Sequence, residues 1–314
     1  MLSSAGLAVL GVLHNGGAAT PAELAVATEH SQKHLYEVLD TLMSAGILTE
    51  SRGNKNQRRV QVTEHPVVEA YRALQANLGH VDWAALLSPA TIRVCWYLDE
   101  PRRVTEIASR LDITRQGVYN ALNPLKGRAL LSPSGPKYAL SAELDPLLGF
   151  VRAVVRHDHH QRLQDCAPSA LIEWCDPKRA LVSVQTPDDT DALQSASEWQ
   201  LTGLARFQEY GLQFYLGGEP AFWYGPDAEL TPAQVVCHTL IRDHGSRHVS
   251  YGMVLCAHLD LDRETMVDTA RWYNLEPVVT AMYRALDGDF DISTDIPLPS
   301  KREFVALKEQ YGVA

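Results

Sequence analysis

Two short polar stretches, at residues 32–36 and 115–119, contain side chains whose types and spacing could read another molecule. Each combines an amide, a cation and a tyrosine. The residues are Gln32, Lys33 and Tyr36 in the first stretch, and Arg115, Gln116 and Tyr119 in the second. Such side chains donate hydrogen bonds to base edges and phosphates when the N-terminus of a helix enters the major groove of DNA. The chemistry they indicate is recognition of a duplex.

The surrounding pattern predicts that each stretch lies at the start of a helix. Ser31 and Thr114 are favourable N-cap residues, and after each of them apolar residues recur at i, i+3, i+4 and i+7. A shorter helical segment and a three-residue turn precede each cap, which is the order of a helix-turn-helix. Pro124 lies inside the second predicted helix, where proline normally kinks or ends a helix. The sequence leaves open whether that helix stops near Asn123.

The two regions are copies of one pattern. Residues 20–48 align on residues 103–131 without a gap, at a constant offset of 83. The matched pairs include Glu23 with Glu106, Ala25 with Ala108, Tyr36 with Tyr119, Leu39 with Leu122 and Leu48 with Leu131. Self-similarity at a fixed offset is the mark of a duplicated structural unit.

A hairpin is predicted after each second helix. In the first copy, strands near 47–51 and 60–63 flank a polar turn with four cations that we expect to contact phosphates or the minor groove. These cations are Arg52, Lys55, Arg58 and Arg59. The second copy has a shorter and less basic turn at 133–137. The sequence therefore predicts tandem winged helix-turn-helix units at residues 1–80 and 81–143, followed by an acidic α+β domain at residues 144–314.

Charge is distributed unevenly along the chain. Residues 1–150 have 14 basic and 14 acidic side chains, whereas residues 151–314 have 14 basic and 24 acidic ones, which accounts for the net charge of −10. A neutral half can approach phosphates, and an acidic half should face away from them. None of the five cysteines forms a C-x-x-C pair, so free thiols in a reducing cytoplasm are expected. With no apolar run of 18 residues, no membrane association is expected.

The third domain offers little evidence of catalysis. His157, His159 and His160 do not share one helical face, so neither a metal nor a cofactor is expected. The segment beginning at Leu201 resembles the opening of nucleotidyltransferase-like domains. The strand that follows, residues 221–224, lacks the carboxylate pair that would hold magnesium. We expect no enzymatic activity.

Taken in order, these parts resemble the AbiEi-like regulators of type IV AbiE toxin–antitoxin systems and their archaeal relatives. The resemblance covers residues 104–140, 199–211 and 263–286. In that family a winged-helix region precedes a domain that looks like an inactive nucleotidyltransferase fold, and the protein represses its own operon and counters a toxin. The resemblance implies an autorepressor with a toxin-like partner protein. The additional winged helix at the N-terminus departs from the family's pattern.

The sequence thus predicts a sequence-specific transcriptional regulator that binds double-stranded DNA as a homodimer. Its third domain would dimerise or bind an effector or a partner protein. Two alternatives remain open. One is a protein-interaction scaffold built on winged helices, and the other is a nucleotidyltransferase with a non-standard site in residues 168–258.

Overall fold

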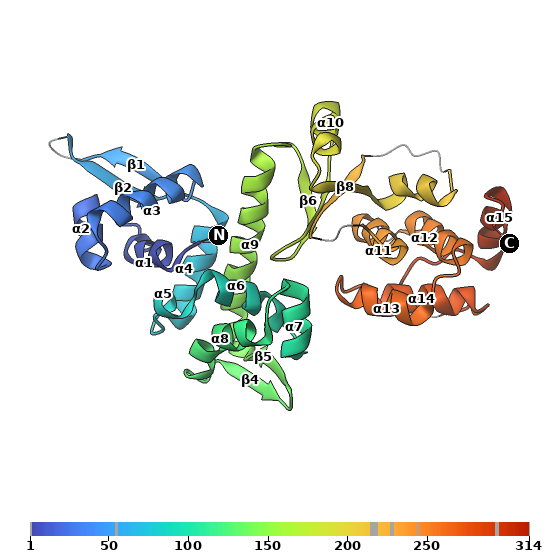
Figure 1. The fold of residues 1–314 in the computed structure, drawn as a ribbon, viewed down its shortest axis with the longest axis horizontal. Coiled ribbons are helices and arrows are strands. Elements are labelled where there is room, and N and C mark those ends of the chain that lie inside the picture. Colours follow the sequence, from blue (N-terminus) through green and yellow to red (C-terminus); the bar gives the residue numbers. More distant parts are fainter. Residues whose placement is uncertain are drawn as a thin grey trace. The chain divides into compact units, whose positions relative to one another are not determined.

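The computed structural model describes residues 2–53, 56–213, 219–226, 229–243, 245–292 and 295–313. In these ranges the chain has mixed α and β structure, mostly helical, with three small antiparallel sheets. It divides into two compact units, an N-terminal unit of residues 1–161 and a C-terminal unit of residues 162–314 (Figure 1). The division falls after most of helix α9 (Asp145–Gln164), later than the predicted boundary at residue 144. None of the described helices is long and apolar enough to cross a membrane.

The first half of the N-terminal unit is three helices followed by a hairpin. The elements are α1 (Ser4–Leu13), α2 (Pro21–Ala27), α3 (Gln32–Ser44), β1 (Leu48–Arg52) and β2 (Arg58–Val62). Strands β1 and β2 pair in antiparallel register, and Ala19 forms a further bridge to Val60 of β2. Helices α4 (Pro66–Leu78) and α5 (Trp83–Leu86) follow.

The second half repeats this order. Its elements are α6 (Pro89–Cys95), η2 (Trp96–Leu98), β3 (Arg102–Arg103), α7 (Val104–Leu111), α8 (Arg115–Lys126), β4 (Leu131–Ser134), β5 (Lys137–Leu140) and η3 (Ala142–Leu144). Its sheet has the order β3-β5-β4. The pairing of Arg102 in β3 with β5 corresponds to the bridge of Ala19, 83 residues earlier, with β2. The duplicated sequence therefore forms a duplicated arrangement of elements.

The turn between the paired helices is also repeated. Glu29 and Asp112, again 83 residues apart, both have left-handed backbone, with φ of 56° and 52°. An aspartate adopts this region more readily than most residues with a Cβ, and the short turn before each N-cap requires it. The same chain reversal thus directs α2 into α3 and α7 into α8.

Helix α8 does not stop at Asn123, because it continues through Pro124 to Lys126. Pro124 lies in the last turn, where its missing amide removes only one hydrogen bond of the helix. The next turn remains closed, since the Gly127 amide donates to the Asn123 carbonyl oxygen over 3.0 Å.

The predicted apolar stripes of α3 and α8 form the cores of the two halves. The buried side chains are Leu35, Val38, Leu39 and Leu42 in α3, and Val118, Ala121, Leu122 and Leu125 in α8. Each fully buried leucine contributes about 1.5–3 kcal/mol relative to an exposed one. Helix α9 packs against α4 through Tyr71 and Phe150, whose ring centroids lie 5.5 Å apart.

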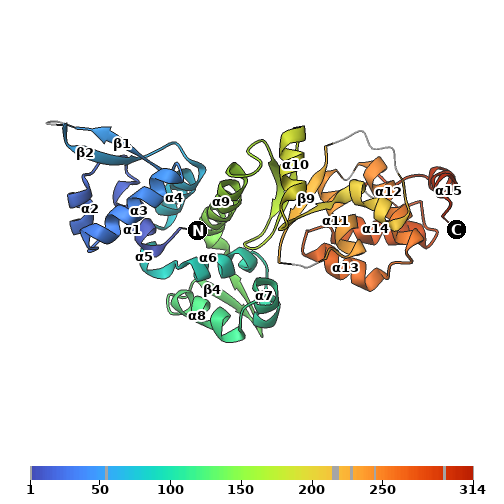
Figure 2. The ribbon, with the colours of Figure 1, turned by 45° about the horizontal axis from the view of Figure 1, so that its top comes forward.

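The C-terminal unit has a four-stranded antiparallel sheet of order β6-β7-β9-β8, and Figure 2 shows α11 to α14 gathered beside it. Its elements are β6 (Leu171–Cys175), β7 (Ala180–Ser183), α10 (Pro187–Ser195), β8 (Trp199–Thr202), η4 (Gly203–Tyr210), β9 (Ala221–Tyr224), α11 (Pro232–Arg242), α12 (Ser246–His258), α13 (Arg263–Arg271), α14 (Glu276–Leu286) and α15 (Lys301–Gln310). Helix α11 packs on the sheet, where His238 stacks on Trp223 with 4.3 Å between ring centroids.

Candidate nucleic-acid interface

Matching caps fix where the helices of both halves begin. The Thr20 amide donates to Glu23 Oε2 over 2.7 Å, and the Arg103 amide donates to Glu106 Oε2 over 2.8 Å. The bond from the Thr20 amide is the main reason why the pKa of Glu23 lies below its ordinary value. These bonds satisfy amides at the starts of α2 and α7 that would otherwise lack a partner in the helix.

The longer helices, α3 and α8, are capped in the same way. Ser31 Oγ accepts from the His34 amide over 3.4 Å, and Thr114 Oγ1 accepts from the Gly117 amide over 3.1 Å. Each cap orients the first two turns of its helix, which hold the polar stretches identified in the sequence.

On α3 the predicted contact residues are all on the surface. Gln32 and Lys33 are exposed in the first turn, and the Tyr36 side chain is 41% exposed one turn later. The Arg58 guanidinium lies over the Tyr36 ring, 5.6 Å from its centroid. The helix and the hairpin therefore form one continuous surface, in which Tyr36 contacts a side chain of β2.

On α8 the corresponding residues are exposed as well. Arg115 and Gln116 lie in the first turn, and Tyr119 is 42% exposed. Gln116 Nε2 donates to Asn120 Oδ1 over 2.9 Å, so the two amides form a hydrogen-bonded pair on the exposed face of α8. Asn120 was not among the predicted residues, although it follows Gln116 by four positions and so shares its helical face.

The cations of the first hairpin fall into two groups. Arg52 is exposed at the end of β1 and donates from Nη1 to Asn56 Oδ1 over 3.3 Å. Arg58 is half-buried, with its Nε 3.0 Å from Glu50 Oε2 and its Nη2 4.0 Å from Asp40 Oδ1. Lys55 lies outside the described residues.

Arg59 is half-buried too. Its Nη2 donates to the Ala18 carbonyl oxygen and lies 4.0 Å from Glu23 Oε2. The structure thus places Arg58 and Arg59 in contacts within the N-terminal unit, where they join the hairpin to α2 and α3. Among the predicted hairpin cations in the described ranges, Arg52 is the one whose side chain is exposed.

Two more cations lie near the end of α8 without having been predicted. Lys126 is in its last turn, Arg128 follows it, and both are exposed. They could have been found in the sequence as two cations, three and five residues after Asn123, at the end of α8 and on the segment that connects it to β4. Cations at the C-terminal end of a helix also interact favourably with its dipole.

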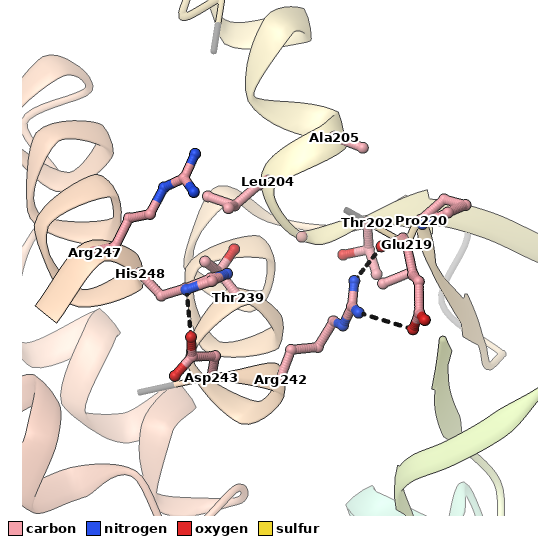
Figure 3. Close-up of a pocket in the computed structure, with 12 residues that line it drawn as sticks. Thr202, Leu204, Ala205, Glu219, Pro220, Thr239, Arg242, Asp243, Arg247 and His248 are labelled. Atoms are coloured by element: carbon pink, nitrogen blue, oxygen red, sulfur yellow. Dashed lines mark hydrogen bonds and ion pairs between the residues drawn. The ribbon is translucent and has the colours of Figure 1, made fainter. Parts of the chain in front are cut away.

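The C-terminal unit contains a cavity of about 430 Å³ that the sequence did not indicate. Figure 3 shows Arg242 at the end of α11, and Arg247 and His248 at the start of α12, around this space. Leu204 and Ala205 of η4 form an apolar wall. The sequence signal was the run RDHGSRH at 242–248, which has two arginines and two histidines in a half that is otherwise strongly acidic.

The histidines considered for metal binding do not form such a site. Among the described residues no three His, Cys, Asp or Glu side chains come together in a geometry that could hold a metal ion. His157 instead packs edge-on against His65, with 4.7 Å between ring centroids. Burial, followed by the proximity of His65, lowers the pKa of His157 to about 4.

Comparison with known proteins gives a family match within the C-terminal unit. Residues 196–313 match the family model HVO_2833_C, C-terminal. This segment begins shortly before β8 and contains every residue that lines the cavity. No match to a curated protein was found. The candidate nucleic-acid interface lies outside the matched segment.

Proposed function

We propose that the chain is a sequence-specific DNA-binding transcriptional regulator, and that each half of its N-terminal unit is a winged helix-turn-helix. The observation that carries the proposal is a duplicated exposed surface. In both halves a capped helix exposes a glutamine, a cation and a tyrosine opposite an apolar stripe that is buried. A helix of this kind can enter a major groove and donate hydrogen bonds to base edges.

The order of elements supports this proposal. Each half runs helix, short pairing segment, helix, turn, helix and hairpin, which is the order of a winged helix-turn-helix. Because two of its arginines hold the first hairpin against α2 and α3, that hairpin has a defined direction from which Arg52 can reach a phosphate.

Charge supports the assignment of partners. The neutral N-terminal half would approach the duplex, and the acidic C-terminal half would be repelled by it. We assign to the C-terminal unit dimerisation or the binding of an effector or partner protein, because a dimer suits a palindromic operator. The resemblance to AbiEi-like regulators adds autorepression and a toxin-like partner to this proposal, with the cytoplasm as its location.

The decisive experiment measures binding of the full chain to two kinds of DNA. One is a set of duplexes selected from a random pool, and the other is the DNA upstream of its own gene. Footprinting then locates the bound site. Arg115→Ala and Tyr119→Ala should each weaken specific binding about tenfold or more, since one good base contact contributes about 1–3 kcal/mol. Arg263→Ala removes an exposed arginine from the C-terminal unit and should leave binding unchanged. Equal affinity of all three variants would contradict the proposed interface.

The same experiment separates the regulator from its alternatives. A scaffold would show no duplex binding that depends on salt, whereas a regulator with about six phosphate contacts should lose orders of magnitude in affinity between about 50 and 200 mM salt. A nucleotidyltransferase would incorporate labelled nucleotide in the presence of a divalent metal. Incorporation that is lost on substitution within residues 168–258 would move the assignment to an enzyme.

A further inference from the structure

The cavity in the C-terminal unit has a cationic side and an apolar side. Arg242, at the end of α11, and Arg247, at the start of α12, line the cavity (Figure 3). Leu204, Ala205 and the backbone of Gly203, all from η4, supply the apolar part of the lining. A volume of about 430 Å³ lies within the range of pockets that enclose small organic ligands.

The two carboxylates at this cavity are already engaged. Asp243 Oδ2 lies 2.9 Å from His248 Nδ1, and its Oδ1 accepts from the Gly245 amide over 2.7 Å. Glu219 Oε2 lies 3.6 Å from Arg242 Nη2. Neither carboxylate approaches Arg247 in the described contacts, so the charge of that arginine is not neutralised by an ion pair within the described residues.

Arg247 keeps unused hydrogen-bonding capacity, whereas the terminal nitrogens of Arg242 are engaged with Glu219. Arg242 Nη1 donates to the Glu219 carbonyl oxygen, and Arg242 Nη2 lies near the Glu219 carboxylate. Arg247 Nε donates to Tyr251 Oη over 3.3 Å, and its guanidinium lies over the Tyr251 ring, 5.5 Å from the centroid. This contact holds the side chain in place and leaves its two terminal nitrogens without a described partner. Arg242 Nε is buried and has no hydrogen-bond partner among the described residues. A buried donor without a partner is costly unless a ligand or water satisfies it.

Two hydroxyl groups complete the polar side. Thr202 and Thr239 both line the cavity and are almost fully buried. Thr202 Oγ1 lies 2.9 Å from His238 Nδ1, and His238 Nε2 lies 3.2 Å from Tyr273 Oη. The contacts of His238 with Thr202 and Tyr273 orient the Thr202 hydroxyl. The lining beside the arginines therefore contains two buried hydroxyl groups.

We propose that this cavity binds a small organic anion, whose oxyanion head group pairs with Arg247 beside the Arg242–Glu219 ion pair and whose apolar body packs against Leu204 and Ala205. Guanidinium groups pair with carboxylates and phosphates through two parallel hydrogen bonds, and both head groups satisfy the geometry. Arg247, whose terminal nitrogens have no described partner, gives an anion a favourable place to bind. The inference rests on the proposed function only in that the bound anion would be the effector of the regulator.

The test uses the full chain without DNA, so that a failure of DNA binding does not affect it. Benzoate and phenyl phosphate serve as probes of the two head groups, and benzamide is the neutral probe of similar shape. Binding is measured by calorimetry and by ligand-observed NMR. Probes of this size should bind with dissociation constants on the order of millimolar. We expect saturable binding of at least one anion and at least tenfold weaker binding of benzamide.

Variants locate the site. Arg247→Gln removes the exposed arginine and should weaken anion binding about tenfold or more without changing the thermal midpoint of unfolding. Arg242→Gln should weaken it as well, and Arg263→Gln on α13 is the matched control that should not. Saturation by neither anion, equal binding of benzamide, or affinities that the Arg247 and Arg242 substitutions leave unchanged would overturn the proposal. Adding the bound probe to a DNA titration then tests the effector role separately.

Discussion

Gly46 and Ala129, which lie 83 residues apart in the turns that follow α3 and α8, have the same left-handed backbone, with φ of 70° and 56°. The residue after each of them closes the helix in the same way. The Ile47 amide donates to the Leu42 carbonyl oxygen over 3.0 Å, and the Leu130 amide donates to the Leu125 carbonyl oxygen over 3.1 Å. Glycine is the usual residue at such a position because it has no Cβ to strain. The second copy keeps the conformation with an alanine.

This difference predicts opposite effects of two reciprocal substitutions. Ala129→Gly relieves left-handed strain at an exposed position and should raise the free energy of unfolding by about 0.5–1 kcal/mol. Gly46→Ala should lower it by about 1 kcal/mol. A Cβ at Gly46 would meet nothing within 4 Å, so the loss reflects backbone conformation alone. Urea and thermal unfolding of the full chain measure both. A shift in the same direction for the two variants would contradict the structural equivalence.

Much of the N-terminal unit could be predicted because its signals are local. The caps at Ser31 and Thr114 and the buried stripes that follow them depend on residues within one or two turns. Whether the helix stops near Asn123 or continues past Pro124 could not be predicted, since a proline near a helix end is compatible with either. The structure decides it, with α8 continuing to Lys126.

Where the structure gives a predicted contact residue a different role, that role depends on contacts between residues far apart in the sequence. Arg59 sits in a turn rich in cations, and nothing nearby in the sequence shows that it reaches the Ala18 carbonyl oxygen, 41 residues away. The cavity was missed for a similar reason. Arg242 and Arg247 are separated by a helix boundary, and Leu204 and Ala205, which also line the cavity, come from a distant segment. A sequence pattern can indicate which face of a helix or strand is buried, but it does not indicate which other element packs against that face.

The two groups of hairpin cations predict separable effects. Arg59→Ala removes a hydrogen bond from a charged donor to a backbone oxygen and should destabilise the N-terminal unit by about 1–3 kcal/mol. Arg52→Ala, at an exposed position, should change stability by less than about 0.5 kcal/mol. It should weaken DNA binding and reduce the salt slope by about one. Parallel denaturation and binding titrations compare the two. The assignment is wrong if Arg52→Ala destabilises the chain more than Arg59→Ala does.

The buried contacts of His238 predict a strong effect on the C-terminal unit. His238→Leu leaves Thr202 and Tyr273 without a ring nitrogen to contact and removes the stacking on Trp223, so it should destabilise the unit by about 2–4 kcal/mol. His258→Gln, on the exposed end of α12, is the control and should cost less than about 1 kcal/mol. Thermal unfolding measures both. Similar losses in the two variants would show that the His238 contacts do not hold the unit together.

Three histidines at or near the contact of α4 with α9 predict that acid destabilises the N-terminal unit. Burial is the main cause that lowers the pKa of His157, to about 4, and it also lowers the pKa of His65 and His160. Between their ordinary value of about 6.5 and the lowered values, the unfolded chain binds protons that the folded chain does not, so stability falls as the pH falls through this window.

His157 should account for a measurable part of that loss, about 1–2 kcal/mol after allowance for its partial exposure to solvent. His65 adds to it, because its Nδ1 accepts the Val67 amide over 3.1 Å at the start of α4 and cannot do so once protonated. The measurement is the thermal midpoint from about pH 7 to pH 4, with His157→Gln beside the unsubstituted chain. The variant should lose less stability across this range, since glutamine takes up no proton. Two parallel profiles would show that the histidines are solvated and that acid acts elsewhere.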